Sequence, residues 1–280
     1  NFGLQKFRID YNGTRDLRIS EPSTFTFKIP RYADLLMDTY LVVSIPDIWS
    51  PIFPQYYPTT STGTNNTTTG DYSQNVAYNF QWIKDLGTQM IKEIEIVAGA
   101  FTLSKYSGDY ISAVVDRDFT TEKKELFNTM SGNIKELNDP SNAYGRINSY
   151  PNAFFQEQSN EDTDIYTPTS TTAGVEPSIR GRDLYIPLNA WFTLNSKCAF
   201  PLIAMQYNEL EIKVTLRPIQ ELFQVRNVLD HANDFPLIQP DFNSNIFQMY
   251  RFLQSPKKTN VFDTLAYGNK INTWNADIHL

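Results

Sequence analysis

Alternation of apolar and polar residues predicts short β-strands along much of the chain. The clearest case is ELEIKVTL (209–216), in which every second side chain is apolar, as in a strand with one face in the core and one toward solvent. The other stretches with an alternating or continuously apolar sequence are 23–29, 35–46, 90–99, 101–106 and 183–188. Short strands separated by Gly, Pro and Asn, without regularly alternating helices, favour facing antiparallel sheets. We therefore expect an all-β fold, an antiparallel jelly-roll β-sandwich.

The residues directly before this strand have a different pattern. FPLIAM (200–205) is apolar throughout. A continuously apolar run of this length is typical of a strand that is covered on both faces. We expect the opposite sheet to cover one face, and either the helical region or a neighbouring subunit to cover the other.

The N-terminal pattern predicts a hairpin. Ile9 and Tyr11 share one face of a predicted strand, and Leu17 lies on the matching face of a returning strand. A two-residue turn at Asn12-Gly13 would place apolar residues opposite polar ones, because cross-strand partners point to the same side of a sheet. The pattern therefore requires a loop with an odd number of residues, and we expect Ile9 opposite Leu17 or Arg15.

Residues 107–131 contain the clearest helical pattern, and they predict a short helical insertion in the β-fold. Apolar residues at helical spacing in the first part are Tyr110, Val114 and Val115. Thr120 or Thr121 is suited to cap a second short helix, which carries Leu126, Phe127 and Met130.

Two long stretches lack the apolar residues that a core requires. Residues 53–79 contain TTSTGTNNTTTGDYSQN, and residues 132–181 are rich in Asn, Pro and Ser. We predict that both are long loop insertions outside the core. The predicted jelly roll then spans residues 1–226, and residues 227–280 form a connector in which 246–253 is either a strand or a packed extended segment.

Composition and charge narrow the functional classes. The chain has 280 residues, of which 41% are hydrophobic, and its formal net charge is −7. This composition supports a sizeable core, and the acidic balance argues against direct binding to nucleic acid. Cys198 is the single cysteine, so no internal disulfide forms, and we expect a core or near-core thiol rather than a nucleophile. Trp82, Trp191 and Phe192 are predicted anchors of the core or of a subunit interface.

Residues with reactive side chains are dispersed along the sequence. His231 and His279 lie far apart, whereas a metal site of this fold class needs a histidine cluster. The acidic stretch 159–164 lacks the glycine and the spacing of a calcium loop. The sequence has no nucleophile elbow and no phosphate-binding or dinucleotide-binding glycine motif. We predict no catalytic, cofactor-binding or metal site and no enzymatic activity; a jelly-roll hydrolase with two facing carboxylates is a third alternative.

Two features are relevant to glycans. Asn65 and Asn66 head Asn-X-Thr sequons in the polar loop, and they are candidate glycosylation sites. Aromatic residues precede this loop: Trp49, Phe53, Tyr56 and Tyr57. We favour a hydrophobic seam between sheet and loop over a sugar-stacking platform. The alternative function is a glycan-binding, lectin-like β-sandwich module.

Several separated motifs resemble one protein family. The run RDLYIPLNAWFTLNSKCAFPLIAMQYNELEI (182–212) is similar to the signature of the major capsid proteins of nucleocytoplasmic large DNA viruses, the giant viruses. The residues that carry this likeness are Tyr185, Ile186, Pro187, Leu188, Trp191, Phe192, Pro201, Leu202, Gln206, Tyr207 and Glu209. MIKEIEIVAGAFTLSKYSGDY (90–110) resembles a strand–turn–strand of the same family that leads into a helix. FKIPRYADLLMDTYLV, ELNDPSNA and RPIQELF look most like the mimivirus-type branch.

The resemblance implies a structural role. Members of this family have a double jelly roll, and three subunits form a pseudo-hexagonal capsomer of an icosahedral capsid. It implies that this chain holds the first jelly roll, and that WNADIHL (274–280) starts a second one that the chain does not supply. Implied partners are the homotrimer, neighbouring capsomers and minor capsid proteins, with no direct nucleic acid contact and at most an indirect contact with a membrane through the capsid's inner layer. The implied location is the virion, assembled in the host cytoplasm, and no cofactor is implied.

Overall fold

The alternating stretches form antiparallel strands, as predicted. The computed structural model describes residues 3–53, 57–59, 69–71, 76–153, 176–205, 207–255, 267–271 and 273–280. One sheet has the strand order β11-β10-β14-β2. Its strands are β2 (Ser23–Ile29), β10 (Ile91–Ala98), β11 (Phe101–Tyr106) and β14 (Leu210–Leu216). In β14 every second residue is buried, which confirms a strand with one face in the core.

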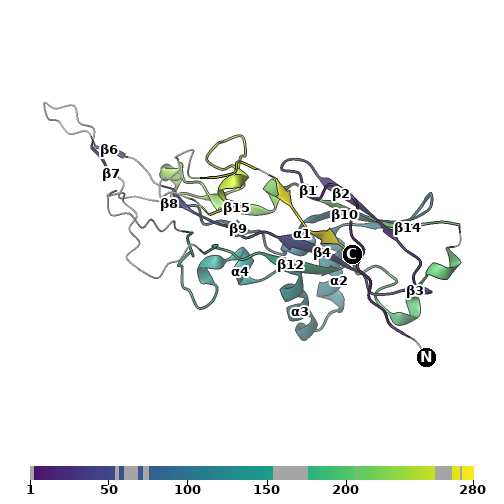
Figure 1. Cartoon of the computed structure of the whole chain (residues 1–280). Coiled ribbons are helices and arrows are strands. Elements are labelled where there is room, and N and C mark those ends of the chain that lie inside the picture. The colour runs from purple at the N-terminus through teal and green to yellow at the C-terminus, as the bar shows by residue number, and fades with distance from the viewer. Residues whose placement is uncertain are drawn as a thin grey trace.

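A facing sheet is built around β4. Its strand order is β12-β4-β18, with β4 (Tyr40–Ile45), β12 (Arg182–Pro187) and β18 (Ile278–His279). The N-terminal segment extends this sheet, because Asp10 forms a β-bridge with His279 and Ile9 exchanges backbone hydrogen bonds with Leu280. Inward-facing residues of both sheets, among them Ile212, Val43 and Ile186, are fully buried in one hydrophobic core. Figure 1 shows the elongated molecule that results.

A long antiparallel ribbon connects the sheets, and it accounts for the sandwich topology. The path β2–β3–β4 runs alongside β14–β13–β12, with β3 (Leu35–Leu36) paired to β13 (Phe200–Pro201) between them. The ribbon starts in one sheet, bends at the β3–β13 pair and continues in the other sheet. A two-stranded ribbon folded over in this way is the basis of a jelly roll.

The bend explains the apolar run that precedes β14. The prediction that residues 200–205 form a strand covered on both faces is wrong, because β13 is short and 3-10 helix η3 (Leu202–Ala204) follows it. Leu202 points into the core, but Ile203 is 63% exposed. A chain that crosses from one layer to the other has to fill the end of the core with one side and to leave the other side open. The predicted strand over 35–46 is divided for the same reason into β3 and β4.

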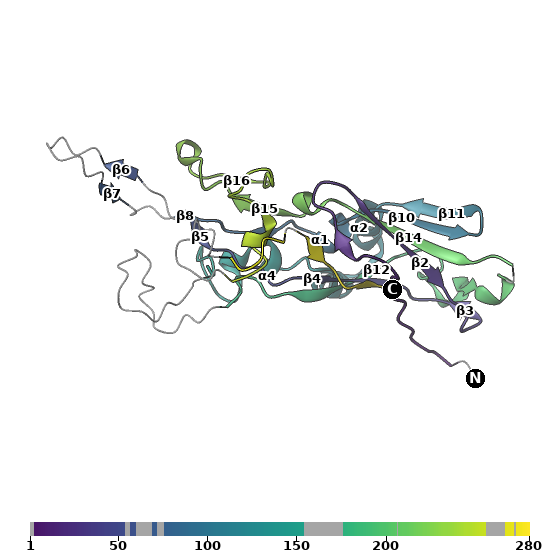
Figure 2. The same ribbon diagram turned by 45° about the horizontal axis from the view of Figure 1, so that its top comes forward.

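The helical prediction for residues 107–131 is confirmed. Helix α2 (Gly108–Asp118) buries Val114 and Val115, and α3 (Thr121–Ser131) follows an extended Thr120, which occupies the predicted capping position. Tyr110 lies at the rim of α2, with its ring 5.2 Å from that of Tyr106. Together with the short α1 (Leu86–Gln89), these helices contact β10 and β12 and so cover one open side of the sandwich (Figures 1 and 2).

The predicted N-terminal hairpin is wrong. Strand β1 (Asp16–Leu17) pairs with β17 (Trp274–Asn275), and Ile9 lies opposite Leu280 instead of Leu17 or Arg15. Residues 274–280 take the place of the predicted partner strand. The alternating N-terminal pattern is compatible with either partner, since the apolar faces still enter the core. Tyr11 packs edge-on against Phe25 of β2, so this segment covers the other open side of the sandwich.

Residues 274–280 are therefore built into the sheets that the ribbon forms. Strand β17 contacts β1, and β18 contacts β4. Trp274 and Ile278 are buried in the common core. The assignment of this segment to the start of a second jelly roll stays a prediction.

An aromatic cluster fills the end of the core opposite the ribbon bend. It includes Tyr78, Phe80, Trp82, Phe223 and Phe252, each at most 1% exposed. The nearby strands are β5 (Ile52–Phe53), β8 (Val76–Ala77), β9 (Gln81–Trp82), β15 (Phe223–Arg226) and β16 (Leu237–Ile238). The prediction for 246–253 named a strand or an extended segment, but these residues form the packed 3-10 helix η6 (Met249–Arg251).

The two predicted loop insertions contribute to the core at their ends, where that prediction is wrong. Strand β5 pairs with β8, which returns Phe53 and Val76 to the core, and the distal part of this loop carries a hairpin of β6 (Tyr57–Thr59) and β7 (Thr69–Asp71). Residues 132–181 include α4 (Lys135–Asn138) and η1 (Pro140–Asn142), with Leu137 and Ile179 buried. Within the described ranges, the structure contains no helix that is long and apolar enough to cross a membrane.

Candidate functional site

The signature residues lie along the ribbon and at its bend. Ile186, Leu188 and Phe192 are fully buried, and Leu202 is nearly so. Their outward-facing neighbours are exposed: Tyr185 and Trp191 by 41% each and Tyr207 by 96%. Pro187 is half-buried, Pro201 pairs with Leu35 at the bend, and Glu209 forms an ion pair with Lys28 at 2.8 Å. Gln206 lies outside the described residues.

The bend presents an exposed apolar surface. We call it the bend surface and define it by Tyr32, Leu35, Trp191, Leu194 and Ile203, which are between 41% and 69% exposed. These residues belong to connected segments, since Leu35 pairs with Pro201 and the amide of Ile203 donates to the carbonyl oxygen of Asp34 at 3.3 Å. Phe7 packs against Tyr32 of this surface, and the centroids of the two rings are 5.2 Å apart. Clustered exposed apolar side chains of this kind are typical of protein–protein contacts.

The predicted aromatic anchors divide between core and surface. Trp82 and Phe192 are core residues. Trp191 packs edge-on against Phe192, at 5.1 Å between ring centroids, and leaves its other side open. Trp191 is therefore the one of these three anchors that a second protein can reach.

Cys198 is not a core thiol. It lies in 3-10 helix η2 (Ser196–Cys198), and it is exposed and free. The apolar residues that follow it belong to the ribbon bend and not to a buried strand, so the expected burial does not arise. The prediction that Cys198 is not a nucleophile stays a prediction.

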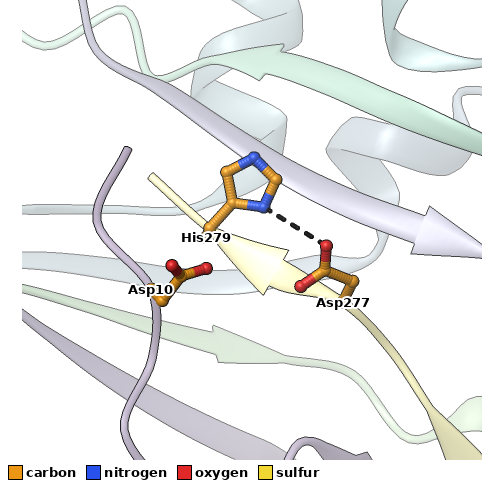
Figure 3. A group of neighbouring side chains, drawn as sticks. All are labelled: Asp10, Asp277 and His279. Atoms are coloured by element: carbon orange, nitrogen blue, oxygen red, sulfur yellow. Dashed lines mark ion pairs between the residues drawn. The ribbon is translucent and has the colours of Figure 1, made fainter. Parts of the chain in front are cut away.

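An ion-pair cluster joins the two ends of the chain. Arg8 bonds to Asp277 at 2.9 Å and to Asp10 at 2.8 Å, and Arg15 bonds to Asp277 at 2.7 Å. His279 lies beside them, with Nδ1 3.9 Å from a carboxylate oxygen of Asp277 (Figure 3). Arg8 and Asp277 are 269 residues apart, so no sequence motif could have indicated this cluster.

Asp10, Asp277 and His279 are close enough to share a metal ion, with ligand atoms within 4.8 Å of one another. The guanidinium groups of Arg8 and Arg15, however, already occupy the carboxylate oxygens and carry the positive charge that a cation would supply. The hydrogen bond from Arg8 holds the pKa of Asp10 below its ordinary value. Burial, followed by the charge of Arg8, lowers the pKa of His279. The arrangement is that of an ion-pair cluster.

The aromatic residues before the polar loop form a seam where the structure describes them. Phe53 is 4% exposed, and its ring packs edge-on against Tyr78 at 5.8 Å. Trp49 is half-buried, and its amide donates to the carbonyl oxygen of Phe252 at 2.8 Å. The side chains of Tyr56 and Tyr57 lie outside the described residues. The seam interpretation is confirmed for Phe53, which cannot stack on a sugar.

Two predicted surface features are not covered by the structure. Asn65 and Asn66, the candidate glycosylation sites, and the acidic stretch 159–164 lie outside the described residues. Glycosylation at these asparagines stays a prediction. In the sheet that contains β10, Glu93 forms an ion pair with Lys105 at 3.0 Å.

Comparison with known proteins identifies relatives among viral capsid proteins. The major capsid protein of Chrysochromulina ericina virus is 27% identical over 248 residues, which cover 83% of this chain and 38% of that protein. Capsid protein 1 of Acanthamoeba polyphaga mimivirus is 22% identical and covers 70% of the chain and 26% of its own length. These matches do not single out the mimivirus-type branch. The chain spans well under half of the length of these relatives.

The fold agrees with this relationship. The Faustovirus major capsid protein superposes with a TM-score of 0.50 at 13% sequence identity, over 81% of this chain and 46% of the other. The family model described as "Major capsid protein N-terminus" matches residues 6–254. That range includes the complete ribbon, its bend, the helical insertion and the aromatic cluster. The chain belongs to the major capsid protein N-terminus family.

Proposed function

We propose that this chain is part of a structural subunit of an icosahedral viral capsid, in which three copies form a pseudo-hexagonal capsomer. The observation that carries the proposal is the family match over residues 6–254, which falls on a sandwich held together by a folded ribbon. A capsid subunit works through shape and buried area, and this fold supplies a rigid wall. No chemical step is needed, so we assign the protein no enzymatic activity.

The way in which the sheet edges are covered determines what kind of contact the copies make. Unpaired edge strands invite uncontrolled pairing with other chains. Here α2 and α3 cover one open side, residues 9–17 cover the other, and a β-bulge interrupts the pairing of β11 next to Ile96. Strand β11 stays at the edge of its sheet, and the bulge makes it a poor partner for another strand. We infer that copies of the protein meet through side chains.

The bend surface is the site that we assign to contacts between copies. Its five apolar residues are exposed, whereas the inward-facing apolar residues of the ribbon, such as Ile186 and Ile212, are buried. Stable interfaces commonly bury more than about 1,200 Å² in total and place aromatic residues near their centre. Trp191, which is supported from below by Phe192 and Phe200, has the rigidity of such an anchor.

The remaining partners follow from the same proposal. Neighbouring capsomers and minor capsid proteins would contact the outer parts of the subunit, and the protein would be located in the virion after assembly in the host cytoplasm. The net charge of −7 supports a role without direct nucleic acid contact. Since the chain spans 38% of one relative, we propose that a second jelly roll follows the first, as the double jelly roll requires.

The glycan-binding alternative is not supported. The relatives are capsid proteins, and of the aromatic residues that could have formed a sugar platform, Phe53 is buried and Trp49 is half-buried. The hydrolase alternative finds no support either, because the proteins that match this chain are described as capsid components.

The assembly state of the full-length gene product tests the proposal. We expect light scattering to give the mass of three copies, and electron microscopy to show particles with a pseudo-hexagonal outline. A protein that stays monomeric, or that forms only dimers, at concentrations well above those of assembly would contradict it.

A charge placed in the bend surface tests the assigned interface. Ile203→Asp is expected to weaken association of the copies at least tenfold, equivalent to about 1.4 kcal/mol, because it buries an unpaired carboxylate at the contact. Folding should be retained, since Ile203 is 63% exposed. Sedimentation measures the association.

Ile147→Asp is the matched control, because Ile147 is 83% exposed and lies in the segment after α4, away from the bend. Its association should equal that of the unsubstituted protein. If Ile147→Asp dissociates the copies and Ile203→Asp does not, the interface lies elsewhere.

A further inference from the structure

The two ends of the described chain hold each other at the edge of the facing sheet. The amide of Ile9 donates to the carbonyl oxygen of Leu280 at 2.7 Å, and the amide of Leu280 donates back at 3.0 Å. The amide of Ala276 donates to the carbonyl oxygen of Arg15 at 3.1 Å. Strand β18 pairs with β4 on its other side, so residues 9 and 10 lie at the edge of this sheet.

His279 lies in the middle of this contact. Its side chain is 14% exposed, and Nδ1 is buried without a hydrogen-bond partner among the residues that the structure describes. The imidazole lies beside the carboxylate of Asp277 (Figure 3). That carboxylate also forms ion pairs with Arg8 and Arg15. The neutral ring therefore fits the site. Protonation would add a positive charge close to the guanidinium groups of Arg8 and Arg15.

The residues packed around the imidazole include charged and uncharged side chains. The charged groups that surround it are Arg8, Asp10, Arg15, Asp183 and Asp277. Strand β4 presents the uncharged Val42, which is opposite His279 in the register. The three carboxylates favour the protonated ring, whereas burial and Arg8 oppose it, and the net result is a pKa of His279 below its ordinary value.

The sign of the pH effect follows from this direction. When the terminal segments separate, His279 becomes solvated and takes up a proton near its ordinary pKa of 6.5. While they are together, it takes up a proton only at lower pH. The neutral His279 therefore contributes fully to the stability of the contact between the two segments above pH 6.5. This contribution is lost as the pH falls below that value.

We propose that residues 8–10 and 277–280 form a pH-sensitive latch, which loosens in mildly acidic solution while the sandwich itself stays folded. The ribbon and the aromatic cluster hold the sandwich through buried apolar side chains that do not titrate in this range. Residues 277–280 belong to this core as well, through Ile278 and Leu280. The contact of residues 8–10 with them, in contrast, depends on a few backbone hydrogen bonds and on the ion-pair cluster. Opening it would expose the edge of β18 that residues 9 and 10 cover, and with it a new surface for another chain.

Proton NMR of the imidazole signals tests the electrostatic part. The chain has two histidines, so the variant His231→Gln leaves the signal of His279 alone. We expect its titration midpoint below 6.5, and we expect Arg8→Gln to raise the midpoint because a repelling charge is removed. A midpoint at or above 6.5, or one that Arg8→Gln leaves unchanged or lowers, overturns the proposal.

Hydrogen exchange tests the opening itself. Between about pH 7.5 and about pH 5.5, residues 8–10 and 277–280 should lose protection after correction for intrinsic exchange rates, by up to about tenfold, because the lower pH is about one unit below the ordinary pKa of histidine. Strand β14 is the internal reference and should keep its protection. In His279→Gln, which cannot take up a proton, the terminal protection should no longer depend on pH.

The outcomes separate a latch from general acid sensitivity. Equal loss of terminal protection in His279→Gln and in the unsubstituted protein overturns the proposal, and so does parallel loss in β14. If His279→Gln does not fold, the His279→Asn variant replaces it, and the titration of the His231→Gln variant decides independently.

Discussion

Replacement of Phe80 by alanine is expected to lower the free energy of unfolding by about 3 to 5 kcal/mol. Phe80 is fully buried, and its ring stacks on that of Phe223 at 4.4 Å with an interplanar angle of 21°. It also packs edge-on against Trp82 at 5.2 Å and contacts Phe252 at 5.5 Å. Rings on several sides cannot collapse together, so a cavity stays and the surrounding contacts are lost. Denaturant unfolding followed by tryptophan fluorescence measures the change.

Phe101→Ala is the matched control for this substitution. Phe101 is 73% exposed at the start of β11, so the same change should alter the free energy of unfolding by about 0.5 kcal/mol or less. Equal losses in the two variants would show that the aromatic cluster does not hold the sandwich together. The comparison also bears on function, because Phe80 connects β9 and β15 to the segment that contains η6.

Replacement of Gly108 by alanine is expected to destabilise the protein by about 2 to 3 kcal/mol, although it lies at the start of a helix. A Cβ atom at this position would lie 1.8 Å from the carbonyl oxygen of Thr88 and 2.9 Å from that of Ile91. Both are backbone atoms, so α1 and α2 would have to move apart. Thermal unfolding followed by circular dichroism measures the loss.

The sign of this effect distinguishes tertiary packing from helix propensity. Alanine is a better helix former than glycine by about 0.5 to 1 kcal/mol, so propensity alone predicts stabilisation. Gly3→Ala is the control, because nothing lies within 4 Å of a Cβ atom at Gly3. A Gly108→Ala variant as stable as the Gly3→Ala variant would mean that α1 and α2 do not pack as closely as described.

Where neighbouring residues decide a structure, sequence patterns predicted it correctly. The alternation in β2 and β14 follows from the pleat of a strand with one wet face, and the pairing partners do not change that pattern. The helical spacing of Val114 and Val115 likewise corresponds to the buried face of α2. In each case the signal lies within a few residues along the chain.

Where the partner is distant in sequence, prediction failed. The N-terminal alternation was correct, but its partners are residues 274–280 rather than the adjacent strand. The apolar run 200–205 looked like a strand, because apolar composition does not distinguish a doubly covered strand from a bend with one side open. The expected burial of Cys198 failed with it.

The candidate sites divide in the same way. The signature residues were chosen from the sequence, and the structure places those that it describes on neighbouring strands and their connecting segment. The bend surface was only partly anticipated, through Trp191, because the exposure of Leu35 and Ile203 depends on where the ribbon turns. The ion-pair cluster was missed, since His279 and its partners in residues 8–15 lie at opposite ends of the chain.

The sequence by itself determined the class of the fold, the strands of the ribbon, the helical insertion and the family likeness. These depend on local periodicity and on motifs that are contiguous in the chain. Only the tertiary structure decided how the edges are covered, which apolar side chains stay exposed and how the two ends are held. Each of these results from contacts between segments that are far apart in sequence. Closing a long loop requires no particular local sequence pattern in the residues that it brings together.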